Sequence, residues 1–173
     1  TQTISGTAEA GSTVTIKDGA ITLGTATADA TGNWTYTATG LAGGTGTVHS
    51  FTATSTDVAG NISSTSSAWS ITIDTSVATP TITAVSPDTG SSGTDKITNS
   101  TTQTISGTAE AGSTVTIKDG ATTLGTATAD ATGAWTYTAT GLAGGTGTVH
   151  SFTATSTDVA GNIRDRKSTR LNS

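Results

Sequence analysis

The chain has 173 residues, enough for one medium domain or two small ones but too few for a large multidomain enzyme. Leu, Ile, Val and Phe together supply only 26 of the 173 residues, so any core must be small, while a net charge of −5 and 11% charged residues are too low for a self-repelling disordered chain. The absence of Cys excludes disulfide scaffolds, thiolate zinc sites and thiol nucleophiles, and no apolar run is long enough to span a membrane.

The first half of the chain alternates apolar and polar residues in short segments, which is the pattern of half-buried β-strands. Thr is abundant in these segments, and its β-branched side chain favours strands. We predict strands at residues 3–7, 13–17, 21–28, 34–38, 48–56 and 68–74. Gly, Asn and Asp residues between them suit tight turns. The sequence therefore predicts an all-β sandwich.

The alternation also predicts which side chains face the core. They are spaced two apart in their strands: Val14 and Ile16, then Trp34, Tyr36 and Ala38, then Trp69, Ile71 and Ile73. Leu23 and Ala26 are out of phase around Gly24, so we predict a β-bulge there.

The only two prolines of the chain, Pro80 and Pro87, lie within residues 79–87. Proline is excluded from central strands, so this stretch is predicted to be a linker that leads into an edge strand of a second domain.

Residues 1–62 recur as residues 102–163 with a constant offset of 101. Only two positions differ: Ile21 becomes Thr122, and Asn33 becomes Ala134. The two copies must therefore share one fold, and a period near 100 residues excludes short-repeat solenoids.

From this repeat we predict two domains, residues 1–75 and 76–163, and we expect the chain to be an internal fragment of a longer tandem array without a leader sequence. The first domain is expected to lack its first strand, and the second to lack the last strand that residues 68–74 give the first copy. We therefore expect the second copy to be the less stable half.

Residues 164–173 hold four of the seven Lys and Arg residues, which leaves the repeat portion with 3 basic and 11 acidic residues, a net charge of −8. A basic tail could bind nucleic acid or anionic lipid. The composition changes in mid-repeat, however, and residues 166–173 resemble translated adapter sequence. We interpret this segment as a non-native tail and predict neither nucleic-acid binding nor membrane insertion.

Three motifs carry a resemblance to a known family. They are TISGTAEAGSTV at residues 3–14, ADATGNWTY at residues 28–36 and TATSTDVAGN at residues 52–61, and all recur in the second copy. The sequence resembles the tandem bacterial immunoglobulin-like repeats of large surface adhesins and biofilm-associated proteins. The replacement of Asn33 by Ala134 puts in doubt a ligand role for that side chain.

This resemblance implies tandem immunoglobulin-like Greek-key β-sandwiches that act as structural spacers in the stalk of a bacterial adhesin, outside the cell at its surface. It also implies neighbouring repeats of the same chain as the partners, with calcium at some domain junctions. Any adhesive ligand stays unknown.

The residue chemistry offers its own argument for structural calcium, because calcium binds oxygen ligands on loops and Asp is the commonest acidic residue. In an immunoglobulin topology the turn from Asp158 to Asn162 lies near the end of the preceding domain, where Asp74 closes a strand. The candidate ligands are Asp74, Asp88, Asp95, Asn99, Asp119, Asp158 and Asn162. The alternative is turn chemistry alone, since Asp side chains commonly cap their own backbone.

Other functional signals are weak. His49 and His150 have no second His nearby in the sequence, so we expect strand packing or a surface position and no zinc. No Gly-x-Ser-x-Gly elbow occurs, and the Gly-rich residues 40–46 precede a strand instead of a helix, so we predict no enzymatic activity. The rival hypothesis is a carbohydrate- or ice-binding module that uses Thr ladders or exposed Trp and Tyr.

Overall fold

The structure is a computed structural model that describes the backbone of residues 1–172 and the side chains of residues 1–164. The chain divides into two compact units, Thr1–Thr75 (unit 1) and Ser76–Ser173 (unit 2). The described residues form strands, turns and loops, and none of them belongs to a helix that could cross a membrane.

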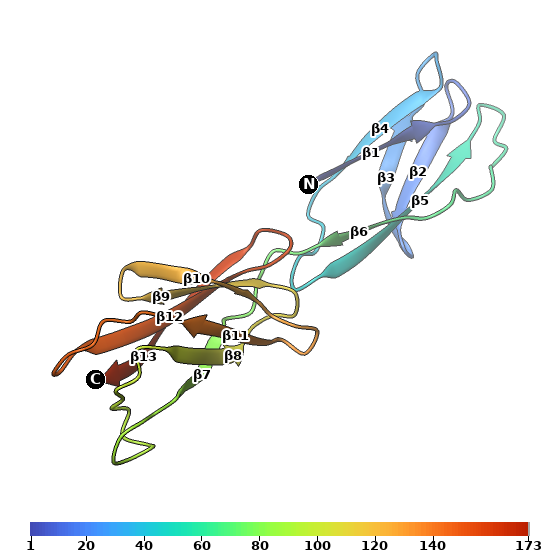
Figure 1. Cartoon of the computed structure of the whole chain (residues 1–173). Coiled ribbons are helices and arrows are strands. Elements are labelled where there is room, and N and C mark those ends of the chain that lie inside the picture. The colour runs from blue at the N-terminus through green and yellow to red at the C-terminus, as the bar shows by residue number, and fades with distance from the viewer. Residues whose placement is uncertain (173) are drawn as a thin grey trace. The chain divides into compact units, whose positions relative to one another are not determined.

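Unit 1 is built from two antiparallel sheets (Figure 1). One sheet pairs β1 (Gln2–Thr7) with β4 (Asn33–Ala38). The other has the order β3-β2-β5-β6, formed by β2 (Thr13–Asp18), β3 (Ile21–Thr27), β5 (Thr47–Thr56) and β6 (Trp69–Ile73). All six predicted strands are present, with ends that differ by one residue at most.

Unit 2 repeats this arrangement with one additional strand (Figure 1). Its first sheet has the order β11-β8-β7, formed by β7 (Thr81–Ser86), β8 (Gln103–Thr108) and β11 (Ala134–Ala139). Its second sheet has the order β10-β9-β12-β13, formed by β9 (Thr114–Asp119), β10 (Thr122–Thr128), β12 (Val149–Thr157) and β13 (Ile163–Asn172). The chain passes repeatedly from one sheet to the other, as in Greek-key sandwiches, so the predicted fold class is confirmed.

The predicted turns and the predicted β-bulge are both present in unit 1. Gly19 adopts φ 54° in the turn between β2 and β3, and Gly32 adopts φ 84° before β4, a backbone region that favours glycine. The register between β2 and β3 shifts where Ile16 pairs with Gly24 while Lys17 pairs with Thr22, so Leu23 is the extra residue of the predicted bulge.

Each core is small and is closed by a tryptophan that packs against a glycine of the neighbouring strand. A Cβ atom added to Gly6 would lie 2.7 Å from the Trp34 ring, and one added to Gly107 would lie 2.7 Å from the Trp135 ring. The glycines therefore let each indole ring lie directly on the backbone of the strand that it covers.

The strands β1 and β8 have the same sequence, QTISGT, but different surroundings. In β8 three of the six residues are buried, whereas in β1 none is. The cause is β7, which pairs with the outer side of β8, while within residues 1–75 β1 pairs only with β4. The proline-flanked segment of unit 2 thus forms the edge strand that the sequence predicts.

The backbone of the basic tail pairs as β13 with β12, in the place that β6 occupies beside β5 in unit 1. The structure does not test the hypothesis that residues 164–173 are a non-native tail. The side chains of residues 165–172 and the whole of residue 173 lie outside the described residues. Because a strand pairs in that position, the backbone edge of β12 is covered, while the expected loss of core concerns side chains that lie outside the described residues. The lower stability expected of the second copy stays a prediction.

The predicted core position of Trp69 is wrong, since its side chain is 75% exposed. Trp69 belongs to β6 at the edge of its sheet. In unit 2 the strand β7 contacts both β12 and β13, whereas unit 1 contains no strand in the corresponding place over β5 and β6. Strand alternation gives the side that Trp69 faces, but a covering element is needed to bury it.

Amide hydrogen exchange tests this difference between identical strands. The N–H of Ala8 donates to Gly32, so the amides of Thr3, Ser5 and Thr7 face away from β4 because successive N–H groups of a strand alternate. We expect them to exchange about tenfold or more faster than the amides of Thr104, Ser106 and Thr108, which face β7. The identical sequences make the intrinsic rates equal, and equal protection would contradict the free edge of β1.

A second test uses the paired glycines. A Cβ atom at Gly107 would collide with the Thr81 carbonyl oxygen of β7, a contact that Gly6 lacks. We expect Gly107→Ala to destabilise unit 2 by about 1–3 kcal/mol more than Gly6→Ala destabilises unit 1, because the tryptophan contact is the same in both. Thermal unfolding followed by residue-resolved NMR separates the two units, and equal losses would argue against close seating of β7.

Candidate metal centre

The turn after β12 holds two of the predicted ligands, Asp158 and Asn162. The Asp158 carboxylate accepts two hydrogen bonds of 2.8 Å, one from the backbone N–H of Asn162 and one from its side-chain amide. Gly161 adopts φ 89° within this turn. The equivalent turn of unit 1 has the same bonds between Asp57 and Asn61, at 2.8 and 2.7 Å. Asp158 therefore performs the capping that turn chemistry alone predicts.

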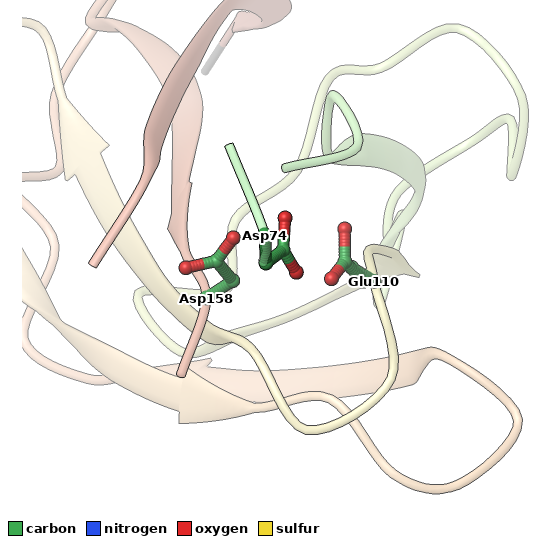
Figure 2. Close-up of side chains that lie close together, drawn as sticks. All are labelled: Asp74, Glu110 and Asp158. Atoms are coloured by element: carbon green, nitrogen blue, oxygen red, sulfur yellow. The ribbon is translucent and has the colours of Figure 1, made fainter. Parts of the chain in front are cut away.

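A second carboxylate of unit 2, Glu110, lies near Asp158, and both are labelled in Figure 2. A carboxylate oxygen of Glu110 lies within 4.8 Å of one of Asp158, and Asp158 is only 9% exposed. Glu110 follows β8 in a tight turn, where its carbonyl accepts the N–H of Ser113 at 3.0 Å. The sequence analysis missed Glu110, because one Glu in a turn has no pattern that distinguishes a ligand from a solvated charge.

Both carboxylates lie beside the segment through which the chain enters unit 2. Glu110 Oε2 accepts the N–H of Ala78 at 2.9 Å, and the hydroxyl of Ser156 donates to the Ala78 carbonyl at 2.9 Å. Asp74, which Figure 2 also labels, belongs to unit 1 and precedes Ala78 by four residues in the chain. Four residues span at most about 14 Å when fully extended.

Hydrogen bonding keeps the turn carboxylate ionised. Burial raises the pKa of Asp158, but hydrogen bonds from Asn162 and from the backbone of the turn outweigh it, so the pKa lies below its ordinary value. In unit 1 the hydrogen bond from the Asn61 side chain is the main cause that lowers the pKa of Asp57. Asp158 therefore carries the negative charge that a cation requires at neutral pH.

Three other predicted ligands lie in the loop between β7 and β8. Asp88 accepts the N–H of Lys96 at 2.9 Å, and Asp95 accepts the N–H of Ile97 at 3.0 Å. The side-chain carbonyl of Asn99 accepts the hydroxyl of Thr89 at 2.7 Å. These groups fold the loop on itself, and among the described residues they do not join a cluster of three acidic groups.

Asp119 lies at the opposite end of its sheet from the Asp158 turn. Asp119 pairs with Phe152 at one end of the β9–β12 register, whereas Thr157, which precedes Asp158, pairs with Thr114 at the other end. Five residues of strand separate these ends by about 17 Å. The seven candidates therefore do not form one site.

The Asp119 carboxylate instead holds a buried histidine. His150 Nδ1 lies 2.6 Å from Asp119 Oδ2, and His49 Nδ1 lies 2.5 Å from Asp18 Oδ2 in unit 1. The second ring nitrogen, Nε2, lies 2.9 Å from the carbonyl oxygen of Ala42 in unit 1 and equally far from that of Ala143 in unit 2. The histidines thus pack in the strands, as predicted, but the ion pair was missed because its partners are 31 residues apart.

These contacts set the protonation of the pairs. In unit 1 the hydrogen bond to Asp18 raises the pKa of His49, and the bond from His49 lowers the pKa of Asp18. In unit 2 burial lowers the pKa of His150, but hydrogen bonds to Asp119 and the Ala143 carbonyl outweigh it and leave the pKa raised. Each imidazole therefore binds its proton more strongly than a free histidine does, and both of its nitrogens lie at hydrogen-bond distance from an acceptor oxygen.

The rival carbohydrate-binding hypothesis relies in part on exposed Trp and Tyr side chains. Trp34 and Trp135 are 8% and 2% exposed, and the Tyr36 and Tyr137 hydroxyls donate to the carbonyls of Leu23 and Leu124. Among the Trp and Tyr side chains only Trp69 is largely exposed.

A family model for the bacterial Ig-like domain matches residues 1–75 and 76–172. The chain therefore belongs to the bacterial Ig-like domain family and contains two tandem copies. No curated protein matches the chain.

Solved structures of bacterial adhesins resemble the chain. A tetra-tandem repeat from the extending region of a large adhesion protein is 21% identical to this chain, with a TM-score of 0.44. The match covers 98% of this chain and 44% of the solved chain. A 1.5-MDa bacterial ice-binding adhesin is 26% identical, with coverages of 98% and 56% and the same TM-score of 0.44. A Ca²⁺-stabilised ice-binding adhesin of an Antarctic bacterium is 31% identical, with coverages of 98% and 42% and again a TM-score of 0.44. The chain thus spans between two fifths and three fifths of these solved chains, which are themselves parts of larger adhesins in at least one case.

The histidine pairs predict a pH dependence of stability. A raised histidine pKa stabilises the fold fully below the unfolded-state value of about 6.5, and this contribution is lost as pH rises through the folded-state pKa. We expect the melting temperature to fall between about pH 6 and pH 9. The lowered pKa of Asp18 has the opposite effect, because its contribution to stability is lost as pH falls through the folded-state pKa of Asp18.

The chain has only two histidines, so the double variant His49→Gln, His150→Gln provides the control. Its melting temperature should be lower at pH 6 and nearly level up to pH 9. A wild-type melting temperature that rises over this range would contradict the ion pairs.

Proposed function

We propose that this chain is a spacer segment from the stalk of a bacterial cell-surface adhesin, located outside the cell and without catalytic chemistry of its own. The observation that carries the proposal is the near-identity of two Ig-like domains that fold as separate compact units. A repeat that supplies length can be copied unchanged, because each copy needs only to fold and to join its neighbours. Neighbouring repeats of the same chain are its proposed partners.

We further propose that structural calcium binds to Glu110 and Asp158. The oxygen ligands of calcium lie 2.3–2.6 Å from the ion, so two ligands on opposite sides are at most about 5 Å apart. Carboxylate oxygens of Glu110 and Asp158 lie within 4.8 Å of one another, which meets that limit. The donor set contains only oxygen, which suits a hard cation.

Asp74 is the proposed further ligand, because the chain tethers it four residues from Ala78, which both Glu110 and Ser156 bind. A shared ion would restrict the hinge between consecutive domains, which a spacer needs in order to hold its length. Asp88, Asp95, Asn99 and Asp119 remain weaker candidates, since each already binds groups of its own loop or strand.

Thermal unfolding of the whole chain in EDTA and across a calcium titration tests the metal. A ligand that prefers the folded state raises stability by about 2.7 kcal/mol at a hundredfold excess over its dissociation constant, or several degrees in melting temperature. We expect a saturable rise for the wild type and none for Glu110→Gln, Asp158→Asn. The equivalent pair in unit 1, Glu9→Gln, Asp57→Asn, is the matched control and should keep the rise.

The absence of a calcium effect in the wild type would remove the metal and leave the spacer proposal intact. The spacer itself is tested by small-angle X-ray scattering of chains extended by one or two further 101-residue repeats. Equal increments in the maximum dimension are expected, and a dimension that does not grow with repeat number would contradict a spacer.

A further inference from the structure

Two Asp-Gly sequences, Asp18-Gly19 and Asp119-Gly120, carry a chemical reactivity that neither the spacer role nor the calcium site uses. They are the only Asp-Gly sequences in the chain, and no Asn-Gly sequence occurs. Each lies at the tight turn that follows a strand, after β2 in unit 1 and after β9 in unit 2. Because glycine has no side chain to shield its backbone nitrogen, that nitrogen can reach the carboxyl group of the preceding residue.

The reaction open to such a pair is ring closure to a succinimide. The nitrogen of Gly19 bonds to Cγ of the protonated Asp18 carboxyl, and the carboxyl OH leaves with the amide hydrogen as one water molecule. Water then adds to one of the two ring carbonyls and opens the ring. Cleavage of the new C–N bond restores aspartate, whereas cleavage of the original peptide C–N bond gives isoaspartate, whose main chain passes through Cβ and Cγ.

One residue of the neighbouring strand binds both groups that would have to react. In unit 1 the backbone N–H of Ser50 donates to Asp18 Oδ1 at 2.8 Å. The carbonyl of the same Ser50 accepts the N–H of Gly19 at 2.9 Å. The carboxyl group and the nitrogen are therefore each fixed to β5 instead of facing one another.

The second carboxylate oxygen is bound by a histidine. His49 Nδ1 lies 2.5 Å from Asp18 Oδ2, and the ring is only 5% exposed. The imidazole is itself fixed, because Nε2 lies 2.9 Å from the Ala42 carbonyl oxygen and the ring stacks on Phe51 with an interplanar angle of 9°. We call the contacts that His49 and Ser50 make with the Asp-Gly pair the clamp.

Ring closure is incompatible with the clamp. It brings the Gly19 nitrogen into one plane with Cα, Cβ and Cγ of Asp18, whereas Asp18 is the last residue of β2 and has extended backbone. The required rotation about the Cα–C bond carries the Gly19 N–H away from the Ser50 carbonyl. The reacting atoms must also approach to about 3–3.5 Å with their orbitals aligned, which the bonds on both carboxylate oxygens oppose.

The clamp is present a second time in unit 2. The Ser151 N–H donates to Asp119 Oδ1 at 2.8 Å, and the Ser151 carbonyl accepts the N–H of Gly120 at 3.0 Å. His150 Nδ1 lies 2.6 Å from Asp119 Oδ2, and its ring stacks on Phe152. The two units thus contain independent copies of one arrangement.

Both histidines of the chain bind aspartates that precede glycine. The turn aspartates Asp29, Asp57, Asp130 and Asp158 instead accept hydrogen bonds from their own turns. Each of these four is followed by Ala or Val, whose side chains hinder attack by the nitrogen. The histidine contact therefore coincides with the more reactive sequence.

We propose that Asp18 and Asp119 are modification sites for isoaspartate formation, and that the clamp keeps both sites closed while the units are folded. The reaction then proceeds only from molecules in which a clamp has opened, so its rate follows the population of that open form. Isoaspartate adds one carbon to the main chain and turns the bound carboxyl into part of it, so the clamp cannot re-form. This inference depends neither on the spacer role nor on calcium.

The test is incubation of the whole chain for weeks at neutral pH. Isoaspartate is measured by enzymatic methylation of its free carboxylate and assigned by mass spectrometry, since Ile21 and Thr122 distinguish the two fragments. In His49→Gln the rate at Asp18 should rise about tenfold or more, while Asp119 keeps its wild-type rate. An unchanged rate at Asp18, or an equal rise at both sites, would overturn the clamp.

The variant Val14→Ala separates the clamp from general stability. Val14 is 1% exposed in the core of unit 1, so its truncation destabilises that unit and leaves the clamp contacts in place. With unit 1 shown to be folded by NMR, Asp18 should form isoaspartate at close to the wild-type rate. A rise equal to that in His49→Gln would assign the protection to global folding and refute the clamp.

The reciprocal variant His150→Gln should raise the rate at Asp119 alone, and it replaces His49→Gln if that variant does not fold. The wild type decides the question if neither variant folds. In urea the clamp is absent, so both sites should react at similar rates, and native chains should react at least about tenfold more slowly. Equal rates in native and denatured chains would contradict the proposal.

Discussion

Each sandwich depends on the contact between one tryptophan and one glycine. Trp34 lies on Gly6 and Trp135 lies on Gly107, and in both places any Cβ atom would displace the ring. Each glycine and its tryptophan are cross-strand partners in one sheet, so the glycine lets the indole ring lie over its own sheet, where the ring joins the buried apolar cluster of that unit. The same glycine lets a further strand approach β8 from its outer edge, so it serves both the core and the edge.

The duplicated sequence provides an internal comparison that few proteins offer. β1 and β8 have the same residues, so the difference in their burial arises from their neighbours alone. A strand edge that is covered in one copy and free in the other shows how much of the burial of a thin sandwich comes from one edge strand. Within residues 1–172 the same strand sequence is therefore buried to different extents.

The acidic residues divide between two tasks. Asp18 and Asp119 hold buried histidines within the sheets, and these pairs are structural. Asp57 and Asp158 close turns, and in unit 2 Glu110 adds a second carboxylate beside the entry segment. The turn chemistry and the proposed calcium site are thus compatible, because a capped, ionised carboxylate can also contribute an oxygen ligand.

The sequence by itself determined the all-β class, the strands and the turns. These depend on side-chain alternation and on Gly, Asn and Asp in reversals, all of which are local properties. The repeat also determined that both units share one fold. Only the tertiary structure decided that Trp69 is exposed, that β13 pairs with β12, that His49 meets Asp18 and that Glu110 lies near Asp158. Such contacts join residues far apart in the chain, and identical segments such as β1 and β8 differ only through neighbours that no local pattern encodes.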